Sequence, residues 1–305
     1  MQDVLSDVLR LIRLKSCVYF ISDFWSPWGM RIDRGPFAQF HVVVRGRCAV
    51  EIDGRRQALG AGDVVLFPRG MGHVLLDGVV SEPVAGTEVV RAIAANEPLF
   101  ADGEDATRLV CGHFDYDRDV GHPLMEELPD MVHVPALETV APGSLATVLP
   151  LLVRELNETQ PGSETIIERL AEVLLIQVIK AHFENDVNGE GFLAAAFDRR
   201  LARALKSIHA DPAEPISMDA LAATAGMSRS AFALHFKSQT GVSPMAYVVK
   251  WRMLQARRLL ETSALPMAEI AARSGYASDV AFSRAFRRTF GEAPSTSRRS
   301  AQNPD

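Results

Sequence analysis

Three arginines near the end of the chain lie among phenylalanines, in a pattern that suits the binding of a polyanion. In the stretch "SDVAFSRAFRRTFG" (278–291), the apolar positions recur at helical spacing and predict one buried stripe. Guanidinium groups on the opposite side would suit phosphates and base edges. An ordinary surface helix, a helix on a membrane surface and a helix in a DNA groove all fit this stretch alone. The stripe is Phe282, Ala285, Phe286 and Phe290, and the other side carries Ser283, Arg284, Arg287 and Arg288.

The charge of the chain is divided unevenly. Residues 198–305 hold 16 basic and 9 acidic side chains, a net charge of +7, whereas residues 1–197 hold 16 and 29, a net charge of −13. A basic third joined to an acidic remainder indicates a module that binds a polyanion, attached to a domain with another role.

Length and composition limit the class of protein. The 305 residues, of which 48% are hydrophobic, are enough for two domains with real cores. The start, "MQDVLSDVLRLIRLK", predicts an amphipathic docking helix and not a signal peptide, and no apolar run approaches the 18 residues of a membrane span. The three cysteines are too few for a disulfide framework. We therefore expect a cytoplasmic protein without a membrane partner.

The basic third contains an internal repeat. Residues 221–244 align with 270–294, so that Gly226, Phe232 and Phe236 match Gly275, Phe282 and Phe286. Each copy predicts a short helix, a turn with glycine, and a second helix capped by serine (Ser228 or Ser278), which is the helix-turn-helix unit.

A long helix is predicted between the two copies. Ser243 as the N-cap and Pro244 at the first helical position start it, and it ends near Thr262. Its length of roughly 28 Å would hold the two units at a spacing that suits successive major grooves, about 34 Å apart.

Residues 198–299 closely resemble the DNA-binding domain of the AraC/XylS family of transcription regulators, with helix-turn-helix units at 216–239 and 266–290. The resemblance implies that exposed residues of the second helix in each unit contact bases. Ala233 and Leu234 depart from the polar residues common in the family, which favours contact with thymine methyl groups and leaves the second unit as the more discriminating one. Lys237, Arg287 and Arg288 suit either phosphate contact or solubility. The base-contacting positions are Arg229, Ser230, Ala233, Leu234, Asp279, Val280, Ser283 and Arg284.

The N-terminal part predicts short antiparallel strands. Between residues 37 and 76, β-rich runs are separated by "RGR", "DGRR" and "GAGD", a pattern typical of a sandwich or barrel. The segment "GAGDVVLFPRGMGH" resembles the second half of the cupin signature, with Pro68, Gly70 and His73 in its P-x-G-x-x-H pattern. The resemblance implies a cupin-like sensing domain over 1–140, a β-barrel of the jelly-roll type.

A metal-dependent cupin enzyme is the alternative function. Such enzymes hold their ion with an H-x-H pair, a glutamate and a later histidine. Here Val43 follows His41 where the second histidine belongs, and Arg47 and Cys48 occupy the region of the glutamate. The sequence therefore favours a sensing domain over an enzyme tethered to a DNA-binding module.

Four residues in the segments that resemble cupins form a candidate metal or redox site: Cys17, His41, His73 and Cys111. Two thiols and two imidazoles would suit a tetrahedral Zn²⁺ site if they converge. Cys17 and Cys111 would alternatively be a redox pair with pKa values lowered by neighbouring imidazolium. Ordinary core packing of these side chains and a plain organic ligand in the domain remain open.

Residues 141–190 predict a helical dimerisation segment. "NETQPGSE" separates helices at about 144–158 and 164–184, and "NDVNGEG" (185–191) predicts the linker that follows. A near-heptad seam in the second helix favours a homodimer, with packing inside the domain as the alternative. The seam is Ile167, Leu170, Leu174, Val178 and Ala181.

The sequence thus predicts a two-domain α+β protein: an N-terminal cupin-like barrel, a helical dimerisation segment, and an all-α domain with tandem helix-turn-helix units. The predicted function is sequence-specific regulation of transcription from double-stranded DNA. The resemblance implies activation as the commoner mode, with RNA polymerase as a partner. The small effector is not identified by the sequence.

Overall fold

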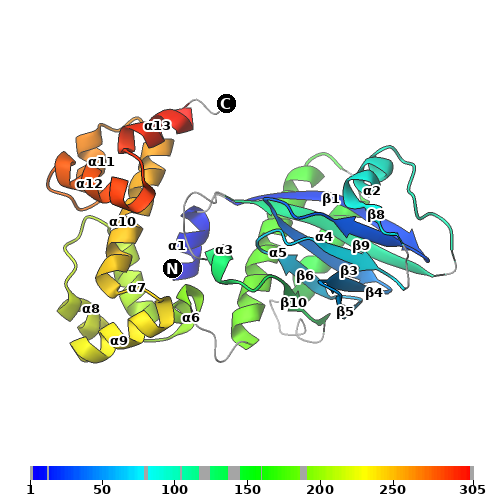
Figure 1. Cartoon of the computed structure of the whole chain (residues 1–305), viewed down its shortest axis with the longest axis horizontal. Coiled ribbons are helices and arrows are strands. Elements are labelled where there is room, and N and C mark those ends of the chain that lie inside the picture. Colours follow the sequence, from blue (N-terminus) through cyan, green and yellow to red (C-terminus); the bar gives the residue numbers. More distant parts are fainter. Residues whose placement is uncertain are drawn as a thin grey trace. The chain divides into compact units, whose positions relative to one another are not determined.

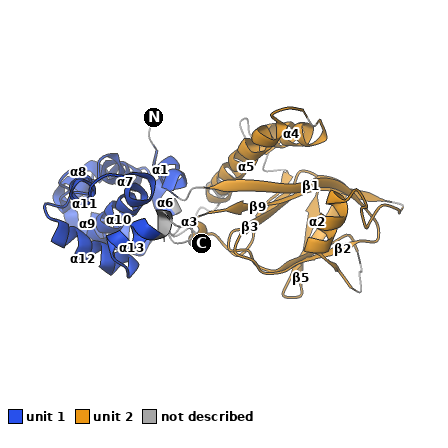
Figure 2. Cartoon of the chain, turned by 90° about the horizontal axis from the view of Figure 1, so that it is seen from above, with its two compact units in different colours: residues 1–13, 118–124, 188–305 blue, residues 14–117, 125–187 orange. Residues whose placement is uncertain are grey.

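The computed structural model divides the chain into two compact units, which are described separately (Figure 2). One comprises residues 14–117 and 125–187, here called the cupin unit. The other comprises residues 1–13, 118–124 and 188–305, here called the helical unit. The structure describes residues 3–11, 14–78, 82–103, 105–116, 124–136, 145–158, 160–185 and 191–302.

The cupin unit contains two five-stranded sheets (Figure 1). The short strands expected between residues 37 and 76 are present as β3 to β7. The first sheet runs in the order β1 (Lys15–Trp25), β9 (Ala106–Asp115), β3 (Ala38–Arg45), β6 (Val64–Phe67), β10 (Val132–Val134). The second runs in the order β5 (Arg55–Gly60), β4 (Arg47–Ile52), β7 (His73–Leu76), β2 (Gly29–Ile32), β8 (Val84–Ala85).

The two sheets of the predicted cupin-like barrel do not close on each other in the part of the chain that the structure describes. Strand pairing in the described residues stays within each sheet, so the two sheets enclose a core without joining at their edges. That core draws residues from both sheets, including Val43 and Phe67 from the first and Val50 and Leu75 from the second. Apolar residues that alternate along each strand are buried by two packed sheets as well as by a barrel, so their pattern did not distinguish the two.

Two long helices of the cupin unit pair with each other, and the second of them also packs on the first sheet. They are α4 (Leu145–Asn157) and α5 (Ser163–Asn185), close to the predicted ranges, and α2 (Gly86–Ala94) and α3 (Leu124–Glu127) are shorter. The predicted dimer seam of α5 is largely internal, since Leu174 and Val178 are buried within the unit. Packing inside the domain, the alternative to a dimer seam, therefore holds for these positions.

The helical unit holds the two predicted helix-turn-helix units. The connecting helix α10 (Pro244–Thr262) has the predicted bounds, and the Ser243 side chain caps it by accepting from the Ala246 amide. The others are α1 (Val4–Leu11), α6 (Phe192–Phe197), α7 (Leu201–Ala210), α8 (Met218–Ala225), α9 (Arg229–Thr240), α11 (Met267–Arg273), α12 (Asp279–Phe290) and α13 (Pro294–Gln302).

The first helix departs from the expected domain boundary at residue 140. Helix α1 groups with the helical unit, where it packs against α6, α7 and α10. Its residues Val4, Val8 and Leu11 are buried, as the amphipathic pattern predicts, but the pattern did not identify their partner. Most of the predicted linker, residues 186–190, lies outside the described residues. In the described part of the chain, no helix combines the length and hydropathy needed to span a membrane.

Candidate DNA-binding surface and signal site

Each helix-turn-helix unit is built by local signals that the sequence displays. Gly226 and Gly275 adopt left-handed conformations with φ of 69° and 77°, which glycine reaches without steric cost. Ser228 and Ser278 cap α9 and α12 by accepting from the amides of Ala231 and Ala281, at 3.3 Å in both cases. The two second helices therefore begin at the same place in each repeat.

Packing fixes which face of each second helix remains free. Phe232 and Phe236 on α9, and Phe282 and Phe286 on α12, are fully buried. The predicted base-contacting residues lie on the other side of both helices. Ala233 and Ser283 are half-buried, and the rest are exposed: Arg229, Ser230, Leu234, Lys237, Asp279, Val280, Arg284, Arg287 and Arg288.

The free face of α12 borders a shallow hollow of about 430 Å³. Five of the predicted contact residues line it: Asp279, Val280, Ser283, Arg284 and Arg287. A hollow edged by guanidinium, hydroxyl and carboxylate groups offers hydrogen-bond donors and acceptors to base edges.

The free face of α9 has a different chemistry. Leu234 is 73% exposed, and it occupies the position that Arg284 holds in the second unit. Arg229 lies 3.3 Å from the Asp219 carboxylate of α8, which holds the guanidinium at the start of the helix. The two units thus present an apolar and a cationic side chain at equivalent places.

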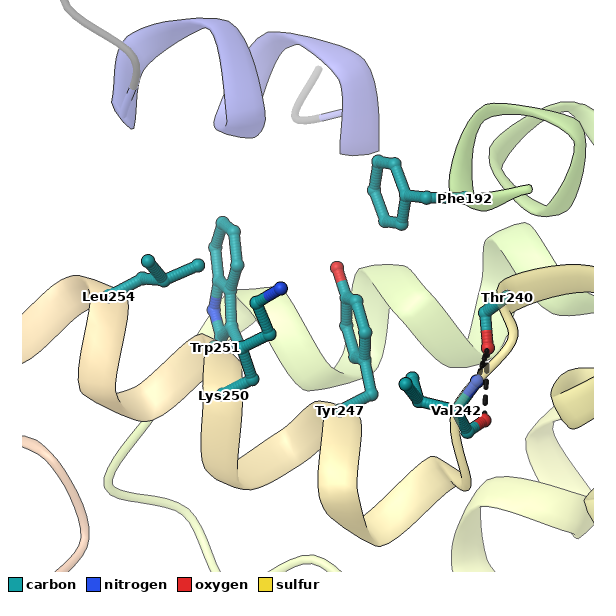
Figure 3. Close-up of a pocket in the computed structure, with 7 residues that line it drawn as sticks. All are labelled: Phe192, Thr240, Val242, Tyr247, Lys250, Trp251 and Leu254. Atoms are coloured by element: carbon teal, nitrogen blue, oxygen red, sulfur yellow. Dashed lines mark hydrogen bonds between the residues drawn. The ribbon is translucent and has the colours of Figure 1, made fainter. Parts of the chain in front are cut away.

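An aromatic cluster packs helix α10 against α6 and α7, which adjoin the first helix-turn-helix unit (Figure 3). Tyr247 stacks on Phe192 of α6, and Trp251 stacks on His209 of α7 with ring centroids 3.5 Å apart. Trp251, Tyr247 and Phe192 line a pocket of about 100 Å³ beside Lys250 and Leu254. The helix is therefore both a spacer and a core element of the first unit.

His209 connects this cluster to α1. Its Nε2 lies 2.8 Å from the Tyr247 hydroxyl, and its Nδ1 faces the Asp7 carboxylate at 3.5 Å. Burial lowers the pKa of His209 to about 3, so the imidazole is neutral near pH 7.

In the cupin unit, three of the four candidate sensing residues come together between the sheets. His41 Nδ1 lies 3.0 Å from Cys111 Sγ, and His41 Nε2 lies 2.8 Å from His73 Nε2. His73 Nδ1 in turn lies 2.8 Å from the Met71 carbonyl oxygen, and the ring stacks on Phe67 with centroids 3.7 Å apart.

The hydrogen-bond partners assign the protons in this chain of groups. A carbonyl only accepts, so His73 Nδ1 carries a proton and Nε2 of the neutral ring accepts. His41 Nε2–H then donates to His73, and the Cys111 thiol donates to His41 Nδ1. Cys111, His41, His73 and the Met71 carbonyl form one continuous relay, called the thiol–imidazole relay below.

Burial keeps every member of the relay neutral. It lowers the pKa of His41 well below its usual value and that of His73 to about 4, and it raises the pKa of Cys111 well above its usual value. The expected lowering of the thiol pKa by imidazolium is therefore wrong. Cys48, in the region of the missing glutamate, lies in the same core, and burial raises the pKa of its thiol to about 12.

Cys17 does not join the relay. It is exposed on β1 and pairs across the sheet with His113, whereas Cys111 pairs with Phe20. This diagonal placement puts the two Cα atoms roughly 7–8 Å apart, beyond the 4.4–6.8 Å that a disulfide spans. A direct Cys17–Cys111 disulfide would require the backbone to move.

The predicted Zn²⁺ ligand set does not fit this arrangement. His41 directs one nitrogen to Cys111 and the other to His73, so the donor atoms lie in series instead of converging on one point. In the part of the chain that the structure describes, no group of three or more His, Cys, Asp or Glu side chains is arranged to hold a metal ion. Val43, at the place of the missing cupin histidine, is a fully buried core residue.

Comparison with known proteins agrees with both halves of this description. Residues 3–184 match the cupin family model, and residues 221–300 match the helix-turn-helix domain model. A putative AraC-like transcription regulator of Streptomyces lividans is 33% identical over 305 residues, covering 99% of this chain and 100% of that protein. The chain belongs to the AraC-like family of transcription regulators.

Two further relatives illustrate the family. The regulator AlkR of Acinetobacter baylyi is 29% identical over 306 residues and covers 96% of this AraC-like chain and 97% of its own. A crystal structure of the DNA-binding domain of AdpA in complex with a target DNA is 36% identical, covers 35% of this chain and 98% of that chain, and has a TM-score of 0.33.

The protein is thus a DNA-binding AraC-like regulator with a cupin domain, as the sequence predicted. Sequence analysis did not identify Asp7 and His209 as a pair. The spacing of Val4, Val8 and Leu11 marked a docking face, but nothing in the sequence connected that face to α7 and α10.

Proposed function

We propose that α9 and α12 enter successive major grooves and contact bases through the residues predicted above. The observation that supports this most strongly is the duplicated, serine-capped second helix with a free face on the side opposite its buried phenylalanines. Arg284 suits bidentate contact with guanine, and Leu234 suits contact with a thymine methyl group. Lys237, Arg287 and Arg288 would contact phosphates.

Titration of the full chain against duplex DNA from its own promoter region tests this proposal. Affinity should exceed that for a scrambled duplex, and log K should fall with log salt at roughly −0.9 per phosphate contacted. Equal affinity for both duplexes, or affinity independent of salt, would contradict it.

We further propose that the regulator is a homodimer that activates transcription with RNA polymerase as its partner. On α5 two exposed apolar side chains, Ile166 and Val173, lie outside the buried seam. Ile166 and Val173 are 45% and 39% exposed, one heptad apart, a spacing that suits a second copy of the same helix.

Light scattering on the purified full chain tests the dimer. Ile166→Glu with Val173→Glu should halve the measured mass, whereas Glu164→Gln with Arg169→Gln, at exposed positions on the same helix, should leave it unchanged. A monomeric wild type would exclude this interface. Transcription in vitro with purified polymerase, with and without the regulator, decides between activation and repression.

The cupin unit, in this proposal, binds its signal without chemical turnover. A neutral relay offers neither an ionised nucleophile nor a convergent ligand set, which argues against the tethered cupin enzyme. Oxygen uptake and metal analysis of the purified protein test this part. Turnover supported by a stoichiometric metal would refute it.

A further inference from the structure

A cleft of about 660 Å³ opens on the cupin unit, a size typical of small-molecule sites. Its walls come from the β4–β5 hairpin, from Met71 just before β7, and from Asp130 and Met131 just before β10. The space between the sheets is itself filled by the apolar core, so a ligand is accommodated at this edge of the core instead of within it.

The floor of the cleft is apolar and adaptable. Val50 belongs to the buried core, and Ile52, Met71 and Met131 are half-buried against it. Methionine side chains adjust to ligands of irregular shape because they are unbranched and polarisable. The floor therefore suits a flexible apolar body.

Strand register determines which charges of the hairpin face the cleft side. Ile52 pairs with Arg55 and Val50 pairs with Gln57, so Arg55 and Gln57 lie on the face of the core residues. Arg56 also borders the cleft, but it pairs with Glu51 on the opposite face of the hairpin, and the two side chains form an ion pair at 2.6 Å.

The remaining charges leave one cation available on this face. Asp130 is neutralised by an ion pair with Arg69. Within the described residues Arg55 forms no ion pair, and it is exposed at the rim. Of the two aspartates that line the cleft, Asp53, at the turn of the hairpin, forms no ion pair with the described residues. The orientation of Arg55 above the apolar floor favours an anionic head group there.

We propose that this cleft binds an amphipathic monocarboxylate, with its carboxylate on Arg55 and Gln57 and its apolar body on Ile52, Met71 and Met131. The inference rests on the proposed signal-binding role of the cupin unit and names its ligand class. The Met71 carbonyl accepts from His73, so a ligand on Met71 adjoins the thiol–imidazole relay.

Calorimetric titration of the full chain with three eight-carbon probes tests the ligand class. Octanoate should bind, whereas octanol and octylamine should bind at least tenfold more weakly, because they lack the anionic head. Preference for octylamine would overturn the proposal in favour of a cation held by Asp53. Equal binding of all three would show an apolar site without head-group recognition and would also overturn it.

Exposed variants locate the head group without disturbing the fold. Arg55→Gln should weaken octanoate binding at least tenfold, and Asp53→Asn should not weaken it. The control Arg45→Gln, which removes an exposed arginine of β3 that pairs with Asp23 of β1, should change the affinity less than twofold. Binding that survives Arg55→Gln would refute the assignment. Because these titrations contain no DNA, their failure is distinguishable from a failure of the DNA-binding proposal.

Discussion

The Asp7 carboxylate lies 3.5 Å from Nδ1 of His209, although 202 positions separate the two residues in the sequence. His209 is buried, and no hydrogen bond to its Nδ1 is formed by the described residues. The contact ties the first helix of the chain to the aromatic cluster beneath α10.

Stability should fall in mild acid because of His209. Its folded-state pKa of about 3 lies below its ordinary value of 6.5, so between these values the unfolded chain binds a proton that the folded chain excludes. The contribution is fully present above pH 6.5 and is lost as the pH falls toward 3. At pH 5 the loss is about 2 kcal/mol.

Urea denaturation at pH 7 and pH 5 of wild type and His209→Gln measures this effect. The variant should lose less stability between the two pH values than wild type. Burial raises the pKa of Asp7, which acts in the opposite direction, so the Asp7→Asn variant should show a larger loss. An identical loss in wild type and His209→Gln would contradict the assignment.

The second recognition helix should carry base specificity through Arg284. Arg284→Ala should cost roughly 1–3 kcal/mol at the cognate site and relax preference at one base pair. The control Arg299→Ala, exposed on α13, should weaken binding to all duplexes about equally. Affinity should be measured for the site and for its single-base variants. If Arg284→Ala weakens binding to all of them equally, Arg284 contacts a phosphate and not a base.

Leu234 should couple to a thymine methyl group. Replacing the contacted thymine by uracil removes one methyl and should cost about 1 kcal/mol with wild type. The same replacement should cost close to nothing with Leu234→Ala, because the partner is already gone. A scan of single thymine-to-uracil changes, with both proteins, identifies the position. Losses that are the same in both proteins at every position would exclude this contact.

Two turn glycines should differ in their tolerance of alanine. Both Gly226 and Gly275 have positive φ, which costs an alanine roughly 1–3 kcal/mol. At Gly275 a Cβ would also lie 2.7 Å from the Pro212 carbonyl oxygen, whereas at Gly226 the nearest atom is 3.6 Å away. Thermal denaturation should therefore show a larger loss for Gly275→Ala. Equal losses would mean that the Pro212 loop yields freely.

The three thiols should react at very different rates. Cys17 is exposed and Cys48 and Cys111 are buried, while burial raises the pKa of all three thiols, so exposure is what distinguishes Cys17. Ellman's reagent should label one thiol rapidly in the native protein and all three in urea. The rapid phase should disappear in Cys17→Ser and persist in Cys111→Ser. Rapid labelling of Cys111 would show that the relay produces a thiolate.

Local pattern determined the DNA-binding half of this protein almost completely. Ser228, Gly226 and Ser243 act on backbone groups within a few residues, so their caps and turns can be predicted from spacing alone. The buried face of α12 follows from the same helical period. The excess of basic residues in residues 198–305 indicated that the partner of this domain is a polyanion.

Only the tertiary structure decided the contacts between distant segments. Four Cys and His residues appeared equivalent in the sequence, yet strand register separates Cys17 from Cys111 by a diagonal, and the two rings lie in series with the thiol. Leu174 and Val178 of the α5 seam proved to be buried within the chain itself. The helical period of α1 predicted its buried face. It did not predict the residues that α1 contacts, His209 among them, because an apolar surface carries no information about the surface that will cover it.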